Sequence, residues 1–174
     1  MICRKAFFAL LALGGLAAPA MAQTLAAPVE AQFTGGPEEA SGTATLTPAR
    51  NGVLIEVRLE KLPPSTWVAL HLHENGVCDH SKGHEAAGGH FNPGAVEHGW
   101  LSETGPHAGD LPNLRTDANG VAEAQVFAPL VTWEEGPASV RGRALIIHEK
   151  ADDYKTQPTG DAGKRLACAV IPAG

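Results

Sequence analysis

The strongest constraint on the fold is an alternation of apolar and polar residues on either side of a short turn. From Val53 to Leu59 every second residue is apolar. A period of two residues gives a β-strand one buried face and one solvated face. A second alternating run precedes this one, and Asn51-Gly52 lies between the two. Because Asn-Gly between alternating runs is a strong hairpin signal, residues 42–62 are predicted to form an antiparallel hairpin.

The rest of the chain repeats this pattern of short strands and turns. Asp117-Ala118-Asn119-Gly120 is the turn of a second predicted hairpin. No window has the apolar period of 3.6 residues that an amphipathic helix requires. Short strands joined by Gly- and Pro-containing turns indicate an all-β sandwich or barrel. Further strands are predicted at residues 67–73, 113–116, 121–128, 143–148 and 165–171.

Two long segments, residues 74–111 and 149–164, interrupt the strand pattern. Loops of this length inside a compact domain are usually functional or disordered. Nearly every residue with metal-binding or catalytic chemistry falls in these two segments. They are therefore predicted to be functional loops.

The N-terminus has the features of a secretory signal peptide. Basic residues precede an apolar run at residues 6–16 that is too short to span a bilayer, and Ala20-Met21-Ala22 is a small-x-small cleavage site. The alternative is a buried N-terminal helix, but the order of these features favours export. We predict that residues 1–22 are cleaved and that residues 23–174 form one domain without membrane insertion, because no later apolar stretch is long enough to span a bilayer.

The charge of the chain excludes one class of partner. Its formal net charge is −6 at pH 7, and loss of residues 1–22, which contain Arg4 and Lys5 and no acidic residue, would lower this to −8. Sequence-independent binding of nucleic acid requires a basic face, so no nucleic-acid partner is expected. An anionic small substrate is still compatible, because positive charge in a cleft can outweigh a negative total.

Cleavage would leave two cysteines, Cys78 and Cys168. An even pair in an oxidising compartment indicates a disulfide. The chain-entropy model assigns about 4–5 kcal/mol to a bridge that closes a loop of roughly 90 residues. Two free thiols, or two thiolate ligands, are the alternative. A disulfide would tie the histidine-rich segment to the last predicted strand.

Histidine is concentrated in residues 71–110, which hold seven of the eight histidines, and His148 follows an apolar run. Imidazole is the commonest metal ligand among side chains. His71 and His73 lie two apart on a predicted strand, so their rings leave the same face. Two neighbouring metal sites, or one site with supporting residues, would use the full set of candidates. That set is His71, His73, His90, His98, His107, Asp110 and His148.

The donor types narrow the metals but not the reaction. Imidazoles with a carboxylate suit zinc, whereas imidazoles alone suit copper(II). Spacing alone leaves redox and hydrolytic chemistry both open. At this point the motifs resemble those of copper/zinc superoxide dismutases, specifically the exported bacterial branch, over almost all of residues 23–174. The motifs are His-Leu-His-Glu-Asn-Gly at 71–76, Gly-Gly-His-Phe-Asn-Pro at 88–93, Gly-Pro-His-Ala-Gly-Asp-Leu-Pro-Asn-Leu at 105–114, Asp-Asp-Tyr at 152–154 and Arg-Leu-Ala-Cys-Ala-Val-Ile at 165–171.

The resemblance implies a fold and two sets of metal ligands. The fold would be an eight-stranded antiparallel Greek-key β-barrel or sandwich with two long functional loops. Each subunit would hold one copper and one zinc ion, and His90 would bridge them. The implied copper ligands are His71, His73, His90 and His148. The implied zinc ligands are His90, His98, His107 and Asp110.

The resemblance also implies an activity and its catalytic residues. Superoxide would be converted to dioxygen and hydrogen peroxide by copper that alternates between Cu(II) and Cu(I). The enzyme would act in the periplasm and would protect the cell envelope from superoxide. Arg165 would orient the superoxide anion, and His90 would deliver a proton. The family's disulfide corresponds to Cys78 and Cys168. Asp152, in preference to Asp153, is the candidate carboxylate that hydrogen-bonds ligands of both metals.

Several features stay open at the level of sequence. His80 and His84 match no metal position of the family, so they are interpreted as solvated loop residues, with an accessory metal-capture site as the alternative. Trp100 lies where an interface aromatic can occur, but a loop-packing role is equally compatible, so monomer and homodimer both remain open. Two other functions compete with the enzyme. One is a non-catalytic copper- and zinc-binding protein. The other is a zinc hydrolase, although the sequence has no Glu or Asp that is clearly placed as its general base.

Overall fold

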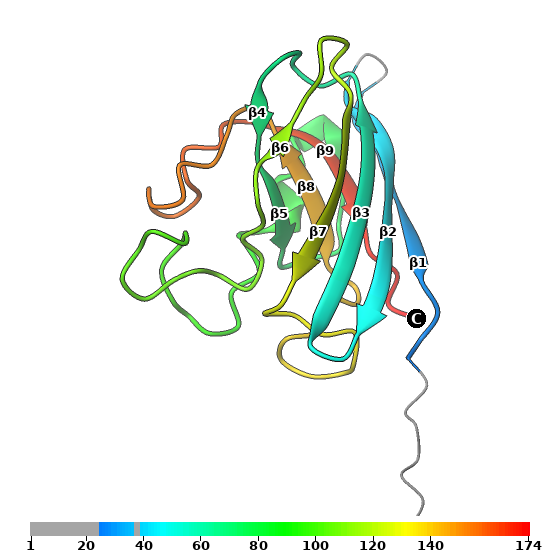
Figure 1. Cartoon of the computed structure of the whole chain (residues 1–174), viewed down its shortest axis with the longest axis vertical. Helices are drawn as coiled ribbons and strands as arrows, with labels where there is room; N and C mark the ends of the chain where they lie inside the picture. Colours follow the sequence, from blue (N-terminus) through cyan, green and yellow to red (C-terminus); the bar gives the residue numbers. More distant parts are fainter. Residues whose placement is uncertain (1–24, 37–38) are drawn as a thin grey trace, which may run out of the picture.

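The computed structural model describes residues 25–36 and 39–174 (Figure 1). The predicted signal peptide, residues 1–22, lies outside the described residues. Nine strands are present in the described part of the chain, and two short 3-10 helices, η1 (His80–Lys82) and η2 (Glu85–Ala87), lie in the first long loop. The strands are β1 (Val29–Phe33), β2 (Ser41–Ala49), β3 (Gly52–Glu60), β4 (Trp67–Val68), β5 (Leu70–His73), β6 (Leu114–Arg115), β7 (Ala122–Ala128), β8 (Ala144–His148) and β9 (Arg165–Val170).

The predicted hairpin forms one half of the molecule. β2 and β3 pair antiparallel with Ala49 opposite Gly52, and the sheet has the order β1-β2-β3-β7. Gly52 has a φ of 152°, and a Cβ there would lie 2.5 Å from the carbonyl oxygen of Ala128. Glycine is therefore required where the hairpin turns. The apolar face of β3 is buried as its alternation predicts.

The second half is the sheet β5-β8-β9, with the two-stranded β4-β6 sheet beside it. Both large sheets are antiparallel, and their apolar faces meet in one core. The prediction of an all-β, antiparallel sandwich is therefore confirmed. Core residues contributed by the two sheets include Leu46, Ile55, Leu59, Leu72, Leu145 and Ile147.

The described residues contain one strand more than the eight implied by the resemblance, and residues 67–73, predicted as one strand, form two. Between them, Ala69 donates its N–H to the carbonyl of Lys150 at 2.8 Å and accepts from the N–H of His148 at 2.9 Å. Along one side, Thr34 and Cys168 exchange backbone hydrogen bonds and link β9 to the chain after β1. The described residues form no closed barrel, and the eight-stranded Greek-key closure stays a prediction.

The two long loops extend from the same side of the sandwich (Figure 1). Asn113, at the end of the first loop, and Asp152, in the second, are joined by two hydrogen bonds of 2.8 Å. Gln157 also bonds both the N–H and the carbonyl of His98, at 2.8 Å each. Among the described residues, no helix has the length and apolarity needed to cross a membrane.

Candidate metal centre

Strand β5 gathers candidate ligands because it is bordered on both edges. On one edge it pairs with β8, whose last residue is His148. On the other edge, isolated bridges join His71 to Asp110 and His73 to His90, so the first long loop lies against the strand. Candidate ligands from three parts of the sequence converge on one short strand.

The first group is the four-histidine cluster, which consists of His71, His73, His90 and His148. All four side chains are buried, and their ligand atoms lie within 4.8 Å of one another. The Nδ1 of His71 and the Nε2 atoms of the other three have no hydrogen-bond partner within the residues that the structure describes. Because buried polar atoms are normally paired, four unpaired nitrogens facing one another fit a site that binds one shared ion.

The second group is the carboxylate cluster, which consists of His90, His98, His107 and Asp110. The Oδ1 of Asp110 lies 2.9 Å from the Nδ1 of His90, 3.0 Å from that of His98 and 3.4 Å from that of His107. The other carboxylate oxygen accepts backbone N–H groups of Gly99 at 2.8 Å and His107 at 3.0 Å. Three imidazole nitrogens therefore surround one oriented carboxylate.

His90 belongs to both clusters through different atoms. Its Nε2 faces the four-histidine cluster, whereas its Nδ1 contacts Asp110. The two nitrogens of an imidazole lie on opposite sides of the ring, and in His90 each nitrogen faces one of the two clusters. The geometry is that of an imidazole shared between two neighbouring sites.

Asp152 connects the two clusters on their far side. Its Oδ2 accepts from the Nε2 of His71 at 2.8 Å, and its Oδ1 lies 3.0 Å from the Nε2 of His98. Such outer carboxylates orient ligand rings and select their tautomers. Asp153 is exposed and instead accepts backbone N–H groups of Lys155 and Thr156.

Carbonyl groups orient two further rings of the four-histidine cluster. The Nδ1 of His73 donates to the carbonyl oxygen of Gly88 at 3.0 Å, and that of His148 donates to Gly163 at 3.4 Å. In each ring this contact leaves Nε2 free to face the cluster. The two carbonyls therefore select the tautomer that a metal needs.

The two clusters differ in the protonation of their histidines. Burial lowers the pKa of His73 and His148 well below the ordinary value, and burial beside His71 lowers the pKa of His90 to about 3. Burial also disfavours charge on His98, but its hydrogen bonds to Asp110 and Asp152 raise its pKa to about 9. The four-histidine cluster is therefore neutral, whereas the carboxylate cluster holds a proton on His98 at pH 7.

The donor atoms fit the two predicted metals. Four neutral imidazole nitrogens, each on a ring whose other nitrogen contacts a carbonyl or a carboxylate, form a copper(II)-type set. Three imidazoles with one carboxylate form a donor set of the zinc type. The two sets share one ring.

Comparison with known families shows to which protein family this arrangement of ligands belongs. The family model for copper/zinc superoxide dismutase matches residues 40–171. The chain belongs to the copper/zinc superoxide dismutase family. Its predicted family and class, the copper- and zinc-dependent oxidoreductases, are confirmed, and copper and zinc are the family's metals.

Individual relatives agree with this family. A Cu-Zn superoxide dismutase of Aquifex aeolicus is 46% identical over 134 residues, which are 75% of this chain and 79% of the relative. A Cu-Zn superoxide dismutase of Caulobacter vibrioides is 39% identical over 137 residues, covering 75% and 78% of the two chains. The crystal structure of a double mutant of a SOD-like protein from Bacillus subtilis has a TM-score of 0.78 and 36% identity, covering 82% of this chain and 96% of the other.

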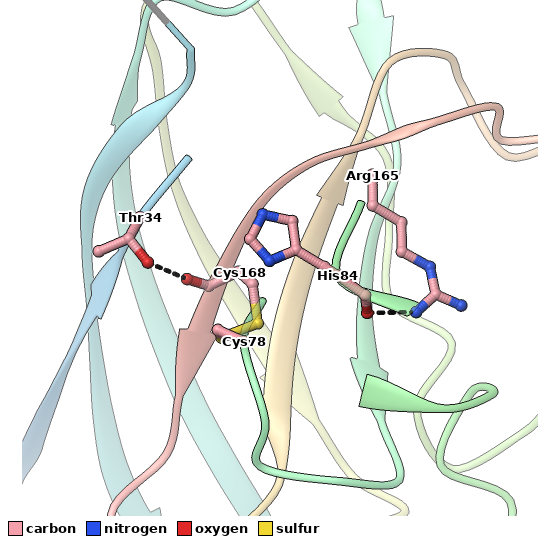
Figure 2. The surroundings of a disulfide bond; sticks show 5 residues. All are labelled: Thr34, Cys78, His84, Arg165 and Cys168. Atoms are coloured by element: carbon pink, nitrogen blue, oxygen red, sulfur yellow. Dashed lines mark hydrogen bonds between the residues drawn. A yellow bond between two sulfur atoms is a disulfide. The ribbon is translucent and has the colours of Figure 1, made fainter. Parts of the chain in front are cut away.

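In this member of the family, β9 carries both the predicted arginine and half of the disulfide. Cys168 is bonded to Cys78 with a Cα–Cα distance of 5.6 Å, so the predicted disulfide is confirmed (Figure 2). Arg165 donates one N–H to the carbonyl of His84 and another to that of Gly88, each at 2.8 Å. The carbonyl of Gly88 also accepts from His73, so one peptide group contacts both Arg165 and a member of the four-histidine cluster.

The interpretation of His84 as a solvated loop residue is wrong. Its side chain is 1% exposed, whereas His80 is exposed and lies 2.9 Å from the Glu39 carboxylate. The loop turns inward at His84 because this residue has a φ of 59°, just after Gly83 with the same φ. No periodicity in the segment signals this reversal. The glycine before it is a weak indication of a turn.

Zinc binding at pH 7 is expected to release about one proton from His98. The pKa of His98 is raised to about 9, and a histidine ring must lose this proton before it can bind a metal. Zinc affinity should therefore rise about tenfold per pH unit up to about pH 9. In the metal-free protein, the charged form of His98 stabilises the fold below the ordinary pKa of 6.5, and that contribution is lost as pH rises through 9.

Calorimetric titration of the metal-free protein with zinc, in buffers of different ionisation enthalpy, measures this proton. The matched control is the same titration at about pH 10, where His98 is already neutral. Zinc binding without proton release at pH 7 would contradict the assignment of a charged His98.

Proposed function

We propose that this protein disproportionates superoxide to dioxygen and hydrogen peroxide, with copper in the four-histidine cluster and zinc in the carboxylate cluster. The observation that carries the proposal is His90, whose two ring nitrogens face the two clusters separately. Bound copper would supply the one-electron redox chemistry, and bound zinc would supply fixed positive charge at the shared ring. Membership of the family supports superoxide as the substrate.

The residues of the chain handle the proton and the rigidity of the site. Forming hydrogen peroxide from superoxide consumes protons, and the Nε2 of His90 is a buried nitrogen without a hydrogen-bond partner in the described part of the chain. We assign to this atom the uptake and delivery of a proton. Asp110 and Asp152 hold the surrounding rings in place, because each accepts hydrogen bonds from more than one histidine.

Arg165 is assigned the role of anion contact. Its guanidinium group stays charged at any relevant pH, and the two backbone carbonyls that it contacts hold it in one orientation. Its side chain keeps 15% of its surface accessible, so a small anion can reach it. A local positive charge of this kind can attract superoxide to a chain whose total charge is negative.

Replacing Arg165 by alanine is expected to lower kcat/KM for superoxide by about tenfold or more, because focused positive charge raises association rates by 10–10³. Copper and zinc contents should not change, since Arg165 contacts carbonyls and no ligand atom. Arg165→Lys is the matched control. It keeps the charge but not the two-pronged contact, so it should recover part of the rate at low ionic strength. Loss of copper from the alanine variant would contradict this role.

A second candidate function is binding of copper and zinc without catalysis. It is favoured by one observation, the similarity to a Bacillus subtilis protein described as superoxide dismutase-like. The two functions are separated by loading the purified protein with copper and zinc, counting both metals and measuring superoxide disproportionation. Two bound metals with activity support the enzyme, whereas two bound metals without activity support the binding protein.

The site of action belongs to the same proposal. We assign residues 1–22 to a cleaved signal peptide and the protein to the periplasm, where it would protect the cell envelope. The disulfide supports an oxidising compartment. The eight-stranded Greek-key topology remains part of the proposal. The sequence leaves monomer and homodimer both open, and Trp100, the candidate interface aromatic, stacks on Tyr154 with ring centroids 4.9 Å apart and thus has a packing role within its own chain.

A further inference from the structure

His84 is a buried histidine outside both metal clusters. Neither of its ring nitrogens has a hydrogen-bond partner among residues 25–36 and 39–174, although the side chain is 1% exposed. A neutral imidazole carries one N–H donor and one acceptor, and leaving a buried polar group unpaired is unfavourable because the group loses its hydration without a replacement. Buried polar groups without a partner are rare and commonly mark a bound ion or a reactive site.

The backbone directs this ring toward the disulfide. His84 has a φ of 59°, a backbone conformation that residues other than glycine rarely adopt. It is held there because its N–H donates to Asp79 at 2.8 Å, while its carbonyl accepts from Arg165 at 2.8 Å. The carbonyl therefore faces Arg165, whereas the ring lies beside the cystine (Figure 2). One ring nitrogen and the sulfurs of Cys78 and Cys168 lie within 4.8 Å of one another.

The chemistry of this trio depends on the state of the sulfurs. In the disulfide they carry no thiolate charge, and the thiolate is the metal ligand. A dithiol reductant can attack the sulfur of Cys78, which is partly exposed, whereas Cys168 is fully buried. The exchange transfers two electrons, leaves the reductant as a disulfide and leaves two thiols on the chain. Cys78 lies outside the strands, so its sulfur can separate from that of Cys168.

We propose that the reduced protein has a third metal site, in which the thiolates of Cys78 and Cys168 and the imidazole of His84 bind one Cu(I) ion. Thiolates select soft metals such as Cu(I), and three donors suit Cu(I), whereas structural zinc takes four. Binding releases two thiol protons and leaves a net charge of −1 on the metal and its ligands. The site and the disulfide exclude each other because they use the same sulfur atoms.

The test measures Cu(I) affinity at the sulfurs. Protein loaded with one equivalent of zinc is reduced by a water-soluble phosphine, which becomes the phosphine oxide, and is titrated with Cu(I) against bicinchoninate. Thiolate-to-copper absorption in the ultraviolet reports this site and not the histidine clusters. The oxidised protein should show no such band. In the reduced protein, His84→Asn should weaken Cu(I) binding by at least about tenfold. Losing a residue that only hydrogen-bonds a metal ligand already lowers metal affinity by about 10–100-fold, and His84 would be a ligand itself.

The control variant is His80→Asn, which removes an exposed histidine four residues away and should leave the affinity unchanged. His84→Gly is a second test variant, because glycine adopts a φ of 59° without strain. It keeps the test valid if the asparagine variant does not fold. Equal Cu(I) affinity in the parent and in a folded His84 variant would overturn the proposal. Tighter binding of Zn(II) than of Cu(I) at the sulfurs would overturn the choice of metal.

Discussion

Replacing His90 by alanine is expected to abolish superoxide disproportionation and to lower the content of both metals. The Nε2 of His90 faces the four-histidine cluster, and its Nδ1 contacts Asp110 in the carboxylate cluster. The substitution therefore removes one donor from each site. Because outer partners of ligands alone are worth 10–100-fold in affinity or activity, we expect activity below about 1% of the parent. Metal counting by mass spectrometry and a superoxide assay measure the two effects.

Two matched variants separate the clusters. His148→Ala removes a donor from the four-histidine cluster alone, so copper should be lost and zinc retained. His107→Ala removes a donor from the carboxylate cluster alone, so zinc should be lost first. His80→Ala, at an exposed residue outside both clusters, should change neither content. Full retention of both metals in the His90 variant would refute the shared-ring assignment.

Removing the disulfide is expected to lower the free energy of unfolding of the metal-free protein by about 4 kcal/mol. The bridge joins residues 90 apart in sequence, and the chain-entropy model assigns about 4–5 kcal/mol to a loop of this length. The variant is Cys78→Ala with Cys168→Ala. Alanine is chosen at position 168 because that side chain is fully buried, and a serine hydroxyl there would add a desolvation cost. Denaturant unfolding of both proteins measures the difference.

The same variant should also reduce the rate of the metal-loaded enzyme. The carbonyls of His84 and Gly88, which hold Arg165, lie in the loop that Cys78 ties to β9. Without the tie, Arg165 loses its fixed orientation. Adding Arg165→Ala should then have a smaller effect than it has in the parent, because the two changes act on one contact. The coupling would be contradicted if the free energy of unfolding fell by less than about 1 kcal/mol and if the disulfide variant and Arg165→Ala lowered the rate independently of each other.

Local chemistry explains why the strands were predictable and why the loops were only partly so. The alternation in β3 places its apolar residues on one face whatever the partner strand is, so burial follows from spacing. Residues 67–73 have an equally continuous pattern but split at Ala69, whose hydrogen bonds go to Lys150 and His148. Those partners lie about 80 residues away, and no local pattern contains them.

The same distinction applies to the candidate site. Asp152 and Asp153 are adjacent and chemically identical, yet only Asp152 contacts His71 and His98, because the second loop is held to Asn113 by two hydrogen bonds. Family resemblance favoured Asp152, and the fold supplies the reason. For His84, sequence reasoning failed. A polar loop composition predicts exposure, but a left-handed backbone turn buries the ring.

The sequence by itself determined the all-β class, the first hairpin, the cysteine pair and the candidate donor atoms, because these depend on residue type and short-range spacing. Only the tertiary structure decided which nitrogen of each ring is free, how His90 divides its two nitrogens between the clusters, and how Arg165 is oriented. Each of these depends on a backbone carbonyl or carboxylate brought from a distant segment, such as Gly88, Asp110 and Asp152. Ligand identity is a property of the chain, whereas ligand orientation is a property of the fold.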